Sequence, residues 1–208
     1  MNANLKNTQI YVLSSPSGGG KTTLRNRLLQ INPDLFYSVS CTTREPRSNE
    51  VEGKDYFFIT SEIFRKRIDE NGFIEFAQVF DHFYGTPKQP VDQAIKEGRD
   101  VILDLDPQGA LEIKSQLNAI LIYIIPPSLE SLKARLFNRD TDKHEEILKR
   151  LAEARNELKN IEQYDYAVVN DRIEYTVNII RSIMEAEKYK IAKQKYLLGL
   201  LQQEIYNI

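Results

Sequence analysis

Cysteine is nearly absent from the sequence: Cys41 is the only one among 208 residues, so no disulfide bond can form within the chain. No secretory signal peptide is recognisable, and with so little cysteine we expect a reducing, cytoplasmic location. Long hydrophobic runs are also lacking. The longest, such as residues 119–127, are too short to cross a bilayer, so no membrane partner is expected. The formal net charge of −2 gives no overall basic field, which argues against a nucleic-acid partner.

What is present is the composition of an ordinary globular protein, with 41% hydrophobic and 28% charged residues. The length suffices for one substantial domain with room for inserted subdomains. Strand-like and helix-like stretches alternate, which predicts a three-layer α/β fold around a parallel central sheet. The predicted strands are residues 9–14, 36–40, 55–59, 73–80, 83–86, 100–106, 119–125 and 166–170. The predicted helices are residues 20–31, 60–70, 87–97, 108–116, 128–138, a stretch ending near 163 and a long helix after 171. Residues 41–54 are expected to form a polar loop.

One stretch, SSPSGGGKTTL at residues 14–24, lies between an apolar run and a helix-like segment. Strand, glycine-rich turn, Lys-Thr and helix form the layout of a phosphate-binding loop. Glycines let backbone N–H groups surround a polyphosphate, and the helix adds the positive end of its dipole. Lys21 can reach the β- and γ-phosphates, and Thr22 can offer its hydroxyl directly to Mg²⁺. The alternative is a flexible turn with a surface lysine. The residues expected to bind a nucleotide polyphosphate are Ser15, Pro16, Ser17, Gly18, Gly19, Gly20, Lys21, Thr22 and Thr23.

Ser15 departs from the motif, because the usual pattern G-x-x-x-x-G-K-[ST] has its first glycine there. A serine is strained at that position if the backbone needs a positive φ, and harmless if it does not. The remaining motif positions are intact, so we predict that the serine is tolerated.

Two carboxylates, Asp104 and Asp106, end the strand predicted at residues 100–106. Side chains two apart on a strand point to one face. Ligands of parallel sheets collect at the carboxyl ends of the strands, where the phosphate-binding loop also lies. Asp104 could therefore orient Mg²⁺ or its waters, and Asp106 could contact a second substrate. The alternative is a pair of solvated strand-end acids.

Arginines gather between residues 126 and 155. Arg135 and Arg139 are four residues apart and would share a helix face, and Arg150 and Arg155 follow on the next helical stretch. Guanidinium groups suit the oxygens of a phosphoryl group in transfer, and a hinged lid that carries them would exclude water. The alternative is ordinary surface pairing with neighbouring glutamates.

The most specific pattern is SVSCTTREPR at residues 38–47, continued by EVEGKDY at residues 50–56. Further segments follow in order: FIEFA at 73–77, YGT at 84–86, DLDPQG at 104–109, PPS at 126–128, YDY at 164–166 and ND at 170–171. With these segments the chain resembles the guanylate kinases over residues 10–180. The resemblance implies a P-loop NTPase fold, with one domain over about residues 9–190. Its parts would be a core (residues 1–36, 88–125 and 164–208), a small α+β GMP-binding insert (37–87) and a helical lid with flanking helices (126–163).

The resemblance further implies transfer of a phosphoryl group from ATP to GMP, giving ADP and GDP, with Mg²⁺ as cofactor. It leaves open whether dGMP is accepted and whether the chain is a monomer or a homo-oligomer. By similarity, Arg135 and Arg139 would embrace the donor phosphates. The residues expected to act in catalysis are Lys21, Arg44, Arg135 and Arg150. The residues expected around GMP are Ser40, Arg44, Arg47, Glu50, Tyr56, Glu75, Tyr84, Gly85, Thr86, Asp104 and Asp106.

The chemistry of these residue types agrees with the implied roles. Arg44 and Arg47 with phenolic hydroxyls suit a dianionic monophosphate. A carboxylate at Glu75 can accept from guanine N1–H and the 2-amino group together, whereas adenine offers neither donor. Hydroxyls at Ser40 and Thr86 can donate to guanine O6.

Some residues differ from the usual pattern of the family. Asn49 and Asp140 stand where glycines are usual, Phe76 replaces a frequent tryptophan, and Asp81-His82 replaces a glycine-containing turn. Asp140 puts an anion near the expected donor phosphates, but none of these changes removes a group with an expected role.

The tail beyond about residue 190 is apolar on one side and needs a surface to cover. We expect it to pack against its own core, with a subunit contact as the alternative.

Two other functions stay open at this point. One is a kinase of another nucleoside monophosphate or of a phosphorylated sugar on the same fold. The other is a catalytically silent, guanylate-kinase-like binding module, against which the intact Gly20-Lys21-Thr22 argues.

Overall fold

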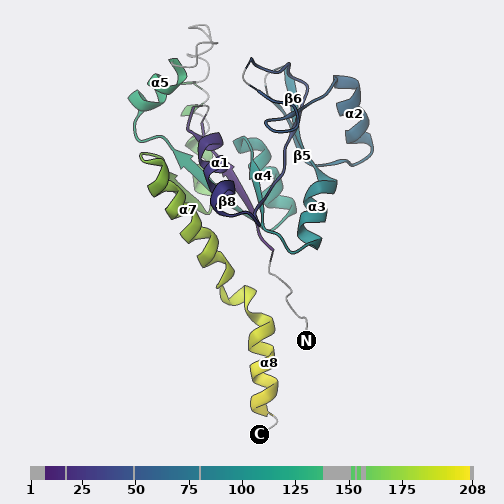
Figure 1. Ribbon diagram of the computed structural model, residues 1–208, viewed down its shortest axis with the longest axis vertical. Coiled ribbons are helices and arrows are strands. Elements are labelled where there is room, and N and C mark those ends of the chain that lie inside the picture. The colour runs from purple at the N-terminus through teal and green to yellow at the C-terminus, as the bar shows by residue number, and fades with distance from the viewer. Residues whose placement is uncertain are drawn as a thin grey trace.

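The computed structural model describes residues 8–16, 18–48, 50–79, 81–137, 151–152, 154–155 and 158–206. Its centre is a parallel five-stranded sheet with the strand order β2-β7-β1-β8-β9 (Figure 1). The crossover connections of such a sheet place helices on both of its faces. The strands are β1 (Ile10–Ser14), β2 (Phe36–Tyr37), β7 (Val101–Asp104), β8 (Ala119–Ile125) and β9 (Tyr166–Val169).

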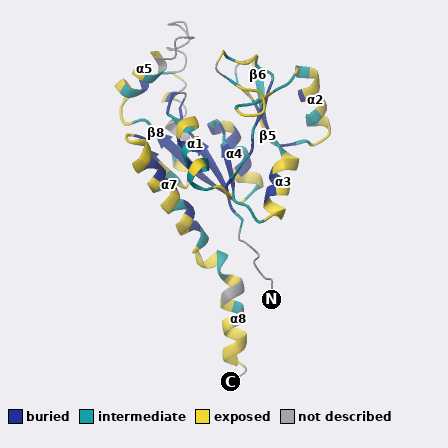
Figure 2. Cartoon of the chain, in the orientation of Figure 1, coloured by how far each residue is buried: buried dark blue, intermediate teal, exposed yellow. Residues whose placement is uncertain are grey.

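Hydrophobic layers enclose the sheet on both sides, and the alternation of side chains along β1 shows how. Tyr11 and Leu13 pack with residues of α1 and α7, whereas Ile10 and Val12 pack on the opposite face with residues of α3 and α4. Figure 2 shows the buried residues on the strands and on the inner sides of these helices. The three layers predicted from the sequence are therefore confirmed. The helices are α1 (Lys21–Ile31), α3 (Lys88–Lys96), α4 (Pro107–Gln116) and α7 (Ile173–Lys188).

A second sheet has four strands in the order β4-β3-β6-β5, and α2 packs against it. Phe64 of α2 stacks on Phe73 of β5 with ring centroids 4.5 Å apart. Helix α4 packs on the central sheet and also contacts β5 of the second sheet, so α4 connects the two sheets. The elements are β3 (Cys41–Thr42), β4 (Phe57–Phe58), α2 (Ser61–Asp69), β5 (Phe73–Val79) and β6 (His82–Pro87).

The structure corrects several predicted bounds. Residues 36–40 were predicted as one strand, but only Phe36–Tyr37 is a strand. The polar loop predicted at 41–54 begins instead with β3, because Cys41 and Thr42 pair with Gly85 and Tyr84 of β6. Because β3 has only two residues and was not predicted, pairing with β6 creates it and local propensity does not, whereas β4 lies within the strand predicted at residues 55–59.

Helix α5 (Leu129–Phe137) begins after Ser128, as predicted, and the Ser128 hydroxyl accepts a hydrogen bond from the Ser131 amide at 3.0 Å. The helix predicted to end near residue 163 finishes as the 3₁₀-helix η1 (Leu158–Gln163). In Figure 1, α5 and the four-stranded sheet flank the edge of the central sheet at which β1 ends. The precise domain boundaries stay predictions. Five residues singled out above lie outside the described residues: Ser17, Asn49, Arg139, Asp140 and Arg150.

The tail does not cover the core, so that expectation was wrong. After η2 (Ile191–Lys193), α8 (Lys195–Tyr206) extends away from the body of the molecule (Figure 1). Among the side chains of α8 that the structure describes, Leu198, Leu201 and Ile205 are 43%, 52% and 68% exposed. The alternative, a contact with another subunit, stays a prediction. None of the helices among the described residues is long and apolar enough to cross a membrane.

Removal of residues 195–208 should therefore leave Tm within about 2 °C, because surface changes rarely exceed about 0.5 kcal/mol in a protein of this size. Thermal unfolding of the full and shortened chains measures this. A control chain that ends at residue 175 should fail to fold, since it loses Val177, Ile180 and Met184 from the buried layer. A fall in Tm of more than about 5 °C on removing α8 alone would mean that α8 covers part of the body in solution.

Candidate active site

The phosphate-binding loop and Asp104 meet at one edge of the central sheet. The loop follows β1, and Asp104 ends β7, the neighbouring parallel strand, where it lies opposite Leu13. Lys21, the first residue of α1, turns towards this strand end. Its Nζ lies 3.4 Å from Asp104 Oδ1 and donates a hydrogen bond to the Leu105 carbonyl oxygen at 3.1 Å. The common edge predicted for the loop and Asp104 is thus present.

The loop backbone explains why Ser15 is harmless. Gly18 and Gly20 have φ angles of 84° and 94°, which favour glycine, whereas Asn71 is the only non-glycine residue with a positive φ in the described part of the chain. Ser15 is therefore unstrained. Its hydroxyl donates a hydrogen bond to the Pro16 carbonyl oxygen at 2.9 Å.

Arg135 of α5 contacts the phosphate-binding loop, although the two are far apart in the sequence. Its Nη1 donates to the Gly19 carbonyl oxygen at 3.4 Å, and its Nη2 donates to the Asn170 carbonyl oxygen at 3.2 Å. The Asn170 amide group also donates to the Gly19 carbonyl oxygen, at 2.9 Å. A Cβ atom at Gly20 would lie 2.4 Å from Asn170 Nδ2, so only glycine fits there. One of the arginines expected in the lid thus contacts the donor loop.

Asp106 does not share a strand face with Asp104, which corrects the prediction. The strand ends at Asp104, and Asp106 is the N-cap of α4, where its Oδ1 accepts a hydrogen bond from the Gly109 amide at 2.9 Å. Pro107 occupies the first helical position, which it suits because a proline there loses no helical hydrogen bond. In the structure Asp106 begins a helix, and its expected contact with a second substrate stays a prediction.

Glu75 is a buried carboxyl group on β5, with 3% of its surface exposed. Thr86 of β6 is also buried, and its hydroxyl donates a hydrogen bond to Glu75 Oε1 at 2.6 Å. Burial raises the pKa of Glu75 to about 7, the nearby Asp106 adds to the rise, and the hydrogen bond from Thr86 opposes it. A Cβ atom at Gly109 would lie 2.6 Å from Glu75 Oε2, so this glycine leaves room for the carboxylate beside α4. The register of β3 against β6, continued by one residue, places Ser40 opposite Thr86.

Arg44 and Glu50 form the centre of a second polar cluster, in the segment between β3 and β4 and beside β6. Arg44 Nη2 donates to both oxygens of Glu50, at 2.8 and 2.9 Å, and Nε donates to Tyr84 Oη at 3.3 Å. The Arg47 amide donates to Glu50 Oε2 at 2.8 Å. Although burial alone would raise it, these hydrogen bonds hold the pKa of Glu50 below its ordinary value. The cluster thus combines two guanidinium groups with one carboxylate and a phenol.

Tyr56 joins this cluster to the central sheet. Its ring meets that of Tyr84 edge-on, with centroids 5.8 Å apart, and lies 5.7 Å from Arg44 Cζ. Burial raises the pKa of the Tyr56 phenol, and the Asp104 carboxylate raises it further. Tyr56 therefore lies close enough to the strand end for the Asp104 carboxylate to act on it electrostatically.

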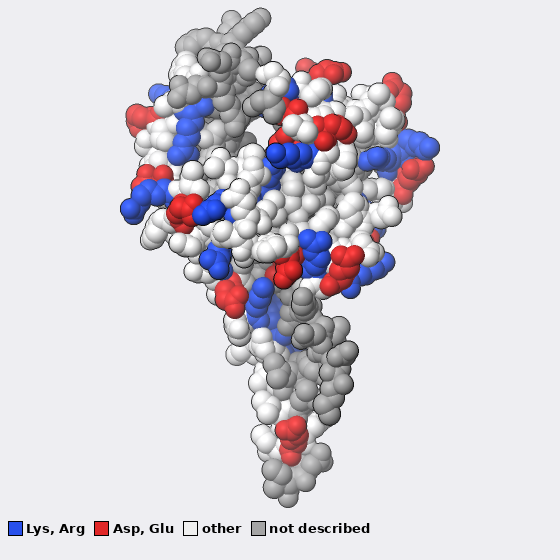
Figure 3. Space-filling model, in the orientation of Figure 1, with Lys and Arg blue, Asp and Glu red and all other residues white. Residues whose placement is uncertain are grey.

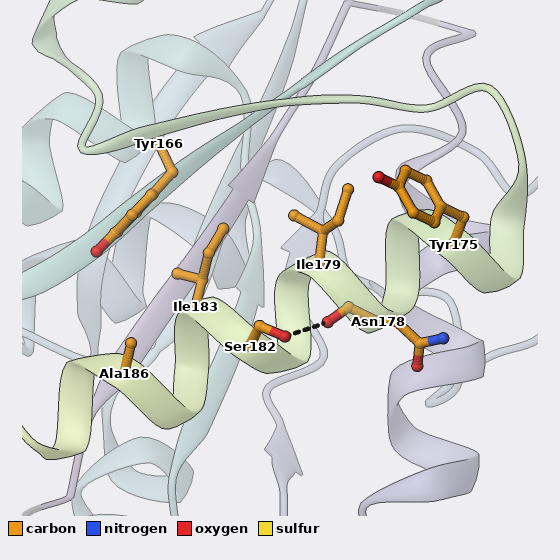
Figure 4. A pocket seen from close by; sticks show the side chains of 7 residues that line it. All are labelled: Tyr166, Tyr175, Asn178, Ile179, Ser182, Ile183 and Ala186. Carbon is orange, nitrogen blue, oxygen red and sulfur yellow. Dashed lines mark hydrogen bonds between the residues drawn. The ribbon is translucent and has the colours of Figure 1, made fainter.

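A shallow apolar hollow of about 430 Å³ lies elsewhere, along the outer side of α7 beside β9 (Figure 4). Tyr175, Ile179 and Ile183 line it, and Ser182 Oγ donates a hydrogen bond to the Asn178 carbonyl oxygen within it at 3.0 Å. None of its lining residues is an expected site residue. In the view of Figure 3, positive and negative side chains are interspersed over the surface of the described residues.

The sequence model of the guanylate kinase family matches residues 7–187. The chain belongs to the guanylate kinase family. It is 43% identical over 196 residues to a guanylate kinase of Caldanaerobacter subterraneus subsp. tengcongensis. The matched residues are 94% of this chain and 95% of the relative. A guanylate kinase of Maricaulis maris is 45% identical over 190 residues, or 90% and 87% of the two chains. The crystal structure of guanylate kinase from Anaplasma phagocytophilum matches with a TM-score of 0.76 at 37% identity and covers 89% of each chain. The family and the fold expected from the sequence are both confirmed.

Two side chains in this guanylate kinase family member were missed at the sequence level. Arg25 of α1 is buried against Asp104 and Tyr37, and Asn170 contacts the phosphate-binding loop. A signal for Arg25 was present, because it follows Lys21 by four residues and so lies on the same face of the helix. Asn170 belonged to a segment noted for its resemblance, but nothing in its neighbourhood in the sequence indicates its contact with Gly19.

Proposed function

We propose that the protein is a guanylate kinase that transfers the γ-phosphoryl group of ATP to GMP. The observation that carries this proposal is the buried Glu75 carboxyl group with its Thr86 partner, in a chain of the guanylate kinase family. A carboxylate in this environment can accept two hydrogen bonds from guanine, at N1–H and the 2-amino group. Adenine offers neither donor, so its binding would leave the buried carboxylate with only the hydrogen bond from Thr86, which is costly for a buried charge.

The donor, ATP, is proposed to bind at residues 15–23 and beside Arg135. The N-terminus of α1, the backbone N–H groups of the loop and Lys21 supply positive charge for its β- and γ-phosphates. Arg139 and Arg150 keep the roles that the family resemblance implies for them, at the donor phosphates and at the reacting groups.

The acceptor phosphate of GMP is proposed to bind at the cluster of Arg44, Arg47, Tyr56 and Tyr84. Guanidinium groups can bind a phosphate with two parallel hydrogen bonds, and Glu50 holds Arg44 ready for this contact. Gly85, in β6 between Tyr84 and Thr86, leaves space along this strand; a Cβ atom there would lie 3.0 Å from the rings of Phe64 and Phe73. Ser40 supplies a hydroxyl for guanine O6, whereas the single O–H of Thr86 is donated to Glu75 and would have to leave that carboxylate to reach O6.

Mg²⁺ is the cofactor proposed for this reaction. The donor atoms suit it: the Thr22 hydroxyl on the first turn of α1 and the Asp104 carboxylate are hard oxygen ligands. No group of three or more His, Cys, Asp or Glu that could hold a metal was found where the structure describes the chain. Mg²⁺ at kinase sites uses one or two protein oxygens together with phosphates, so two residues suffice. When bound, it would supply charge neutralisation at the β- and γ-phosphates.

No side chain needs to act as a nucleophile in the proposed reaction. An oxygen of the GMP phosphate attacks the γ-phosphorus, and the bond from that phosphorus to the β,γ-bridging oxygen breaks and leaves ADP. The protein aligns the two nucleotides and neutralises charge with Lys21, Arg44, Arg135 and Arg150.

A panel of nucleoside monophosphates in a coupled ADP assay, with and without Mg²⁺, tests the proposal. GMP should be turned over fastest, dGMP is included as a second acceptor, and omission of Mg²⁺ with a chelator present should abolish turnover. Faster turnover of AMP than of GMP would refute the guanine assignment. Binding of GMP without turnover of any monophosphate would favour a silent binding module instead.

A further inference from the structure

Arg25 is a buried cation that the proposed reaction does not use. It lies on α1, four residues after Lys21 and thus one turn along the same face of the helix. Only 5% of its surface is exposed, and arginine is rarely buried to this extent unless it is paired. Its partners should therefore explain why the chain keeps a charge at this point.

The guanidinium group of Arg25 divides its donors among three side chains. Nη1 donates to Tyr37 Oη at 2.6 Å and lies 3.6 Å from Asp104 Oδ2. Nε and Nη2 both donate to Asn26 Oδ1, at 3.2 and 3.0 Å. The group also stacks over the Tyr37 ring, with Cζ 4.2 Å from its centroid. Each of its three nitrogens has a partner, so the guanidinium plane is fixed in orientation.

The Asp104 carboxylate is shared between two cations of the same helix. Oδ1 lies 3.4 Å from Lys21 Nζ, and Oδ2 lies 3.6 Å from Arg25 Nη1. The two contacts, one at each oxygen, fix the orientation of the carboxylate at the end of β7. Without Arg25, Lys21 would be the only one of these two cations beside Asp104. A carboxylate with a single strong partner draws that partner closer.

Tyr37 is the second anchor, and it lies at the junction between the two sheets. It ends β2 of the central sheet, and the chain passes from there through residues 38–40 into β3 of the four-stranded sheet. The contact between Arg25 and Tyr37 therefore links α1 to the end of β2. Helix α1 begins at the phosphate-binding loop, and the chain passes from the end of β2 into the four-stranded sheet, where GMP is proposed to bind.

We propose that Arg25 is a positioning residue for phosphoryl transfer. It fixes the Asp104 carboxylate beside Lys21, and it fastens Tyr37 so that the acceptor sheet keeps its place relative to the donor loop. The inference rests on the proposed kinase function. Arg25 acts through Asp104, Lys21 and Tyr37 and does not itself touch a nucleotide.

Arginine suits this role better than lysine because its planar group presents donors in fixed directions. A lysine at this position could keep one contact, to Asp104 or to Tyr37, but not both with the stacking. Positioning groups of this kind typically change activity by about 10–100-fold when they are removed. The loss should appear in kcat, because the groups that bind GMP are not displaced.

The first experiment compares Arg25→Gln, Arg25→Lys and the matched control Arg27→Gln. Arg27 lies on the same helix but pairs with Glu174 at the surface. We expect kcat of Arg25→Gln to fall about 10–100-fold, while the Kd for GMP measured by calorimetry stays close to that of the unaltered protein. The kcat of Arg25→Lys should lie between those of Arg25→Gln and the unaltered protein. Arg27→Gln should match the unaltered protein in kcat, Kd and Tm.

The second experiment uses Asp104→Asn to separate positioning from a general effect on stability. If Arg25 acts through Asp104, Arg25→Gln should cost much less in kcat when Asp104→Asn is already present. Tyr37→Phe keeps the ring and removes only the hydroxyl partner, so it tests the other anchor in a variant that retains its packing. It should lower kcat about fivefold, the equivalent of one hydrogen bond.

The results distinguish the inference from the function on which it rests. An unaltered protein without GMP kinase activity would overturn both. An active protein in which Arg25→Gln keeps its kcat, or in which the effects of Arg25→Gln and Asp104→Asn on kcat are additive, would overturn the positioning role alone. A fall in Tm with unchanged kcat per folded molecule would assign Arg25 to stability only.

Discussion

Replacing Lys21 by alanine should lower kcat for GMP phosphorylation by about 10²–10³-fold, the usual cost of removing one preorganised donor to a developing charge. The reason lies in the position of the ammonium group. Lys21 begins α1 directly after the phosphate-binding loop, and its Nζ is held at the strand end by Asp104 and the Leu105 carbonyl oxygen. A phosphate at the loop would place its oxygens within reach of this group, and alanine would leave the charge that develops there without compensation.

GMP binding should largely persist in Lys21→Ala, because the groups proposed to hold GMP lie in the four-stranded sheet and in the segment between β3 and β4, and not in the phosphate-binding loop. Steady-state kinetics give kcat, and calorimetry gives the Kd for GMP. The control is Lys66→Ala on α2, whose side chain is 76% exposed and pairs only at the surface with Glu70. Equal turnover of Lys21→Ala and the unaltered protein would refute the role of Lys21, whereas a parallel loss of GMP binding would show that the variant is damaged more widely.

The central sheet was predictable because its strands are continuous apolar runs. Residues 119–125 were predicted as a strand and form β8 with those bounds, since a strand buried on both faces leaves no alternating pattern to misinterpret. The four-stranded sheet was harder. Cys41–Thr42 is a strand only because β6 pairs with it, and that pairing joins residues more than 40 positions apart along the chain. Phe57–Phe58 lies within the predicted strand at residues 55–59, but the structure keeps only these two residues as a strand.

At the site, the position of Asp106 was predicted wrongly and Arg25 was missed. Asp106 was assigned to a strand because residues 100–106 are apolar with acids at the end, although Asp-Pro is also a sequence signal for an N-cap followed by the first helical residue. Arg25 was missed because its partners Asp104 and Tyr37 lie on strands distant in the sequence, although its spacing from Lys21 places both on one face of α1. The loop and Lys21 were predictable because their chemistry is contained in consecutive residues.

Replacing Glu75 by glutamine should lower kcat/KM for GMP by about 10²–10³-fold. The amide keeps one acceptor oxygen, but its NH₂ group would face a donor of guanine, so at least one hydrogen bond to a charged group is lost, at about 1.5–3 kcal/mol, and a donor is left unpaired. The substitution keeps the size of the side chain, and Thr86 can still donate to the remaining oxygen. Selectivity for GMP over AMP should fall with it, and the monophosphate panel measures both.

The pH dependence of GMP affinity gives a sharper test of the same residue. The pKa of Glu75 is raised to about 7 by burial, and guanine requires the ionised carboxylate. Below pH 7 the affinity for GMP should therefore fall by up to about tenfold per pH unit, because binding must release a proton. The phosphate of GMP titrates near pH 6 in both proteins, so the difference between the unaltered protein and Glu75→Gln isolates the carboxyl group. Identical pH profiles in the two proteins would contradict the assignment.

Stability should depend on pH in the opposite direction. Since the pKa of Glu75 is raised in the folded state from 4.5 to about 7, the folded protein binds the proton more tightly than the unfolded chain does. The stabilisation by this proton is fully present below pH 4.5 and is lost as the pH rises to 7, with a magnitude on the order of 3 kcal/mol. Glu75→Gln carries no ionisable group there, so its free energy of unfolding should exceed that of the unaltered protein at pH 8 and approach it at pH 5. Urea unfolding of both proteins at these two pH values measures the difference, and a gap that does not change with pH would show that Glu75 is not the group that titrates. The unaltered protein should then bind GMP best at the pH at which the protein without GMP is least stable. The reason is that the same buried carboxylate favours GMP binding and opposes folding.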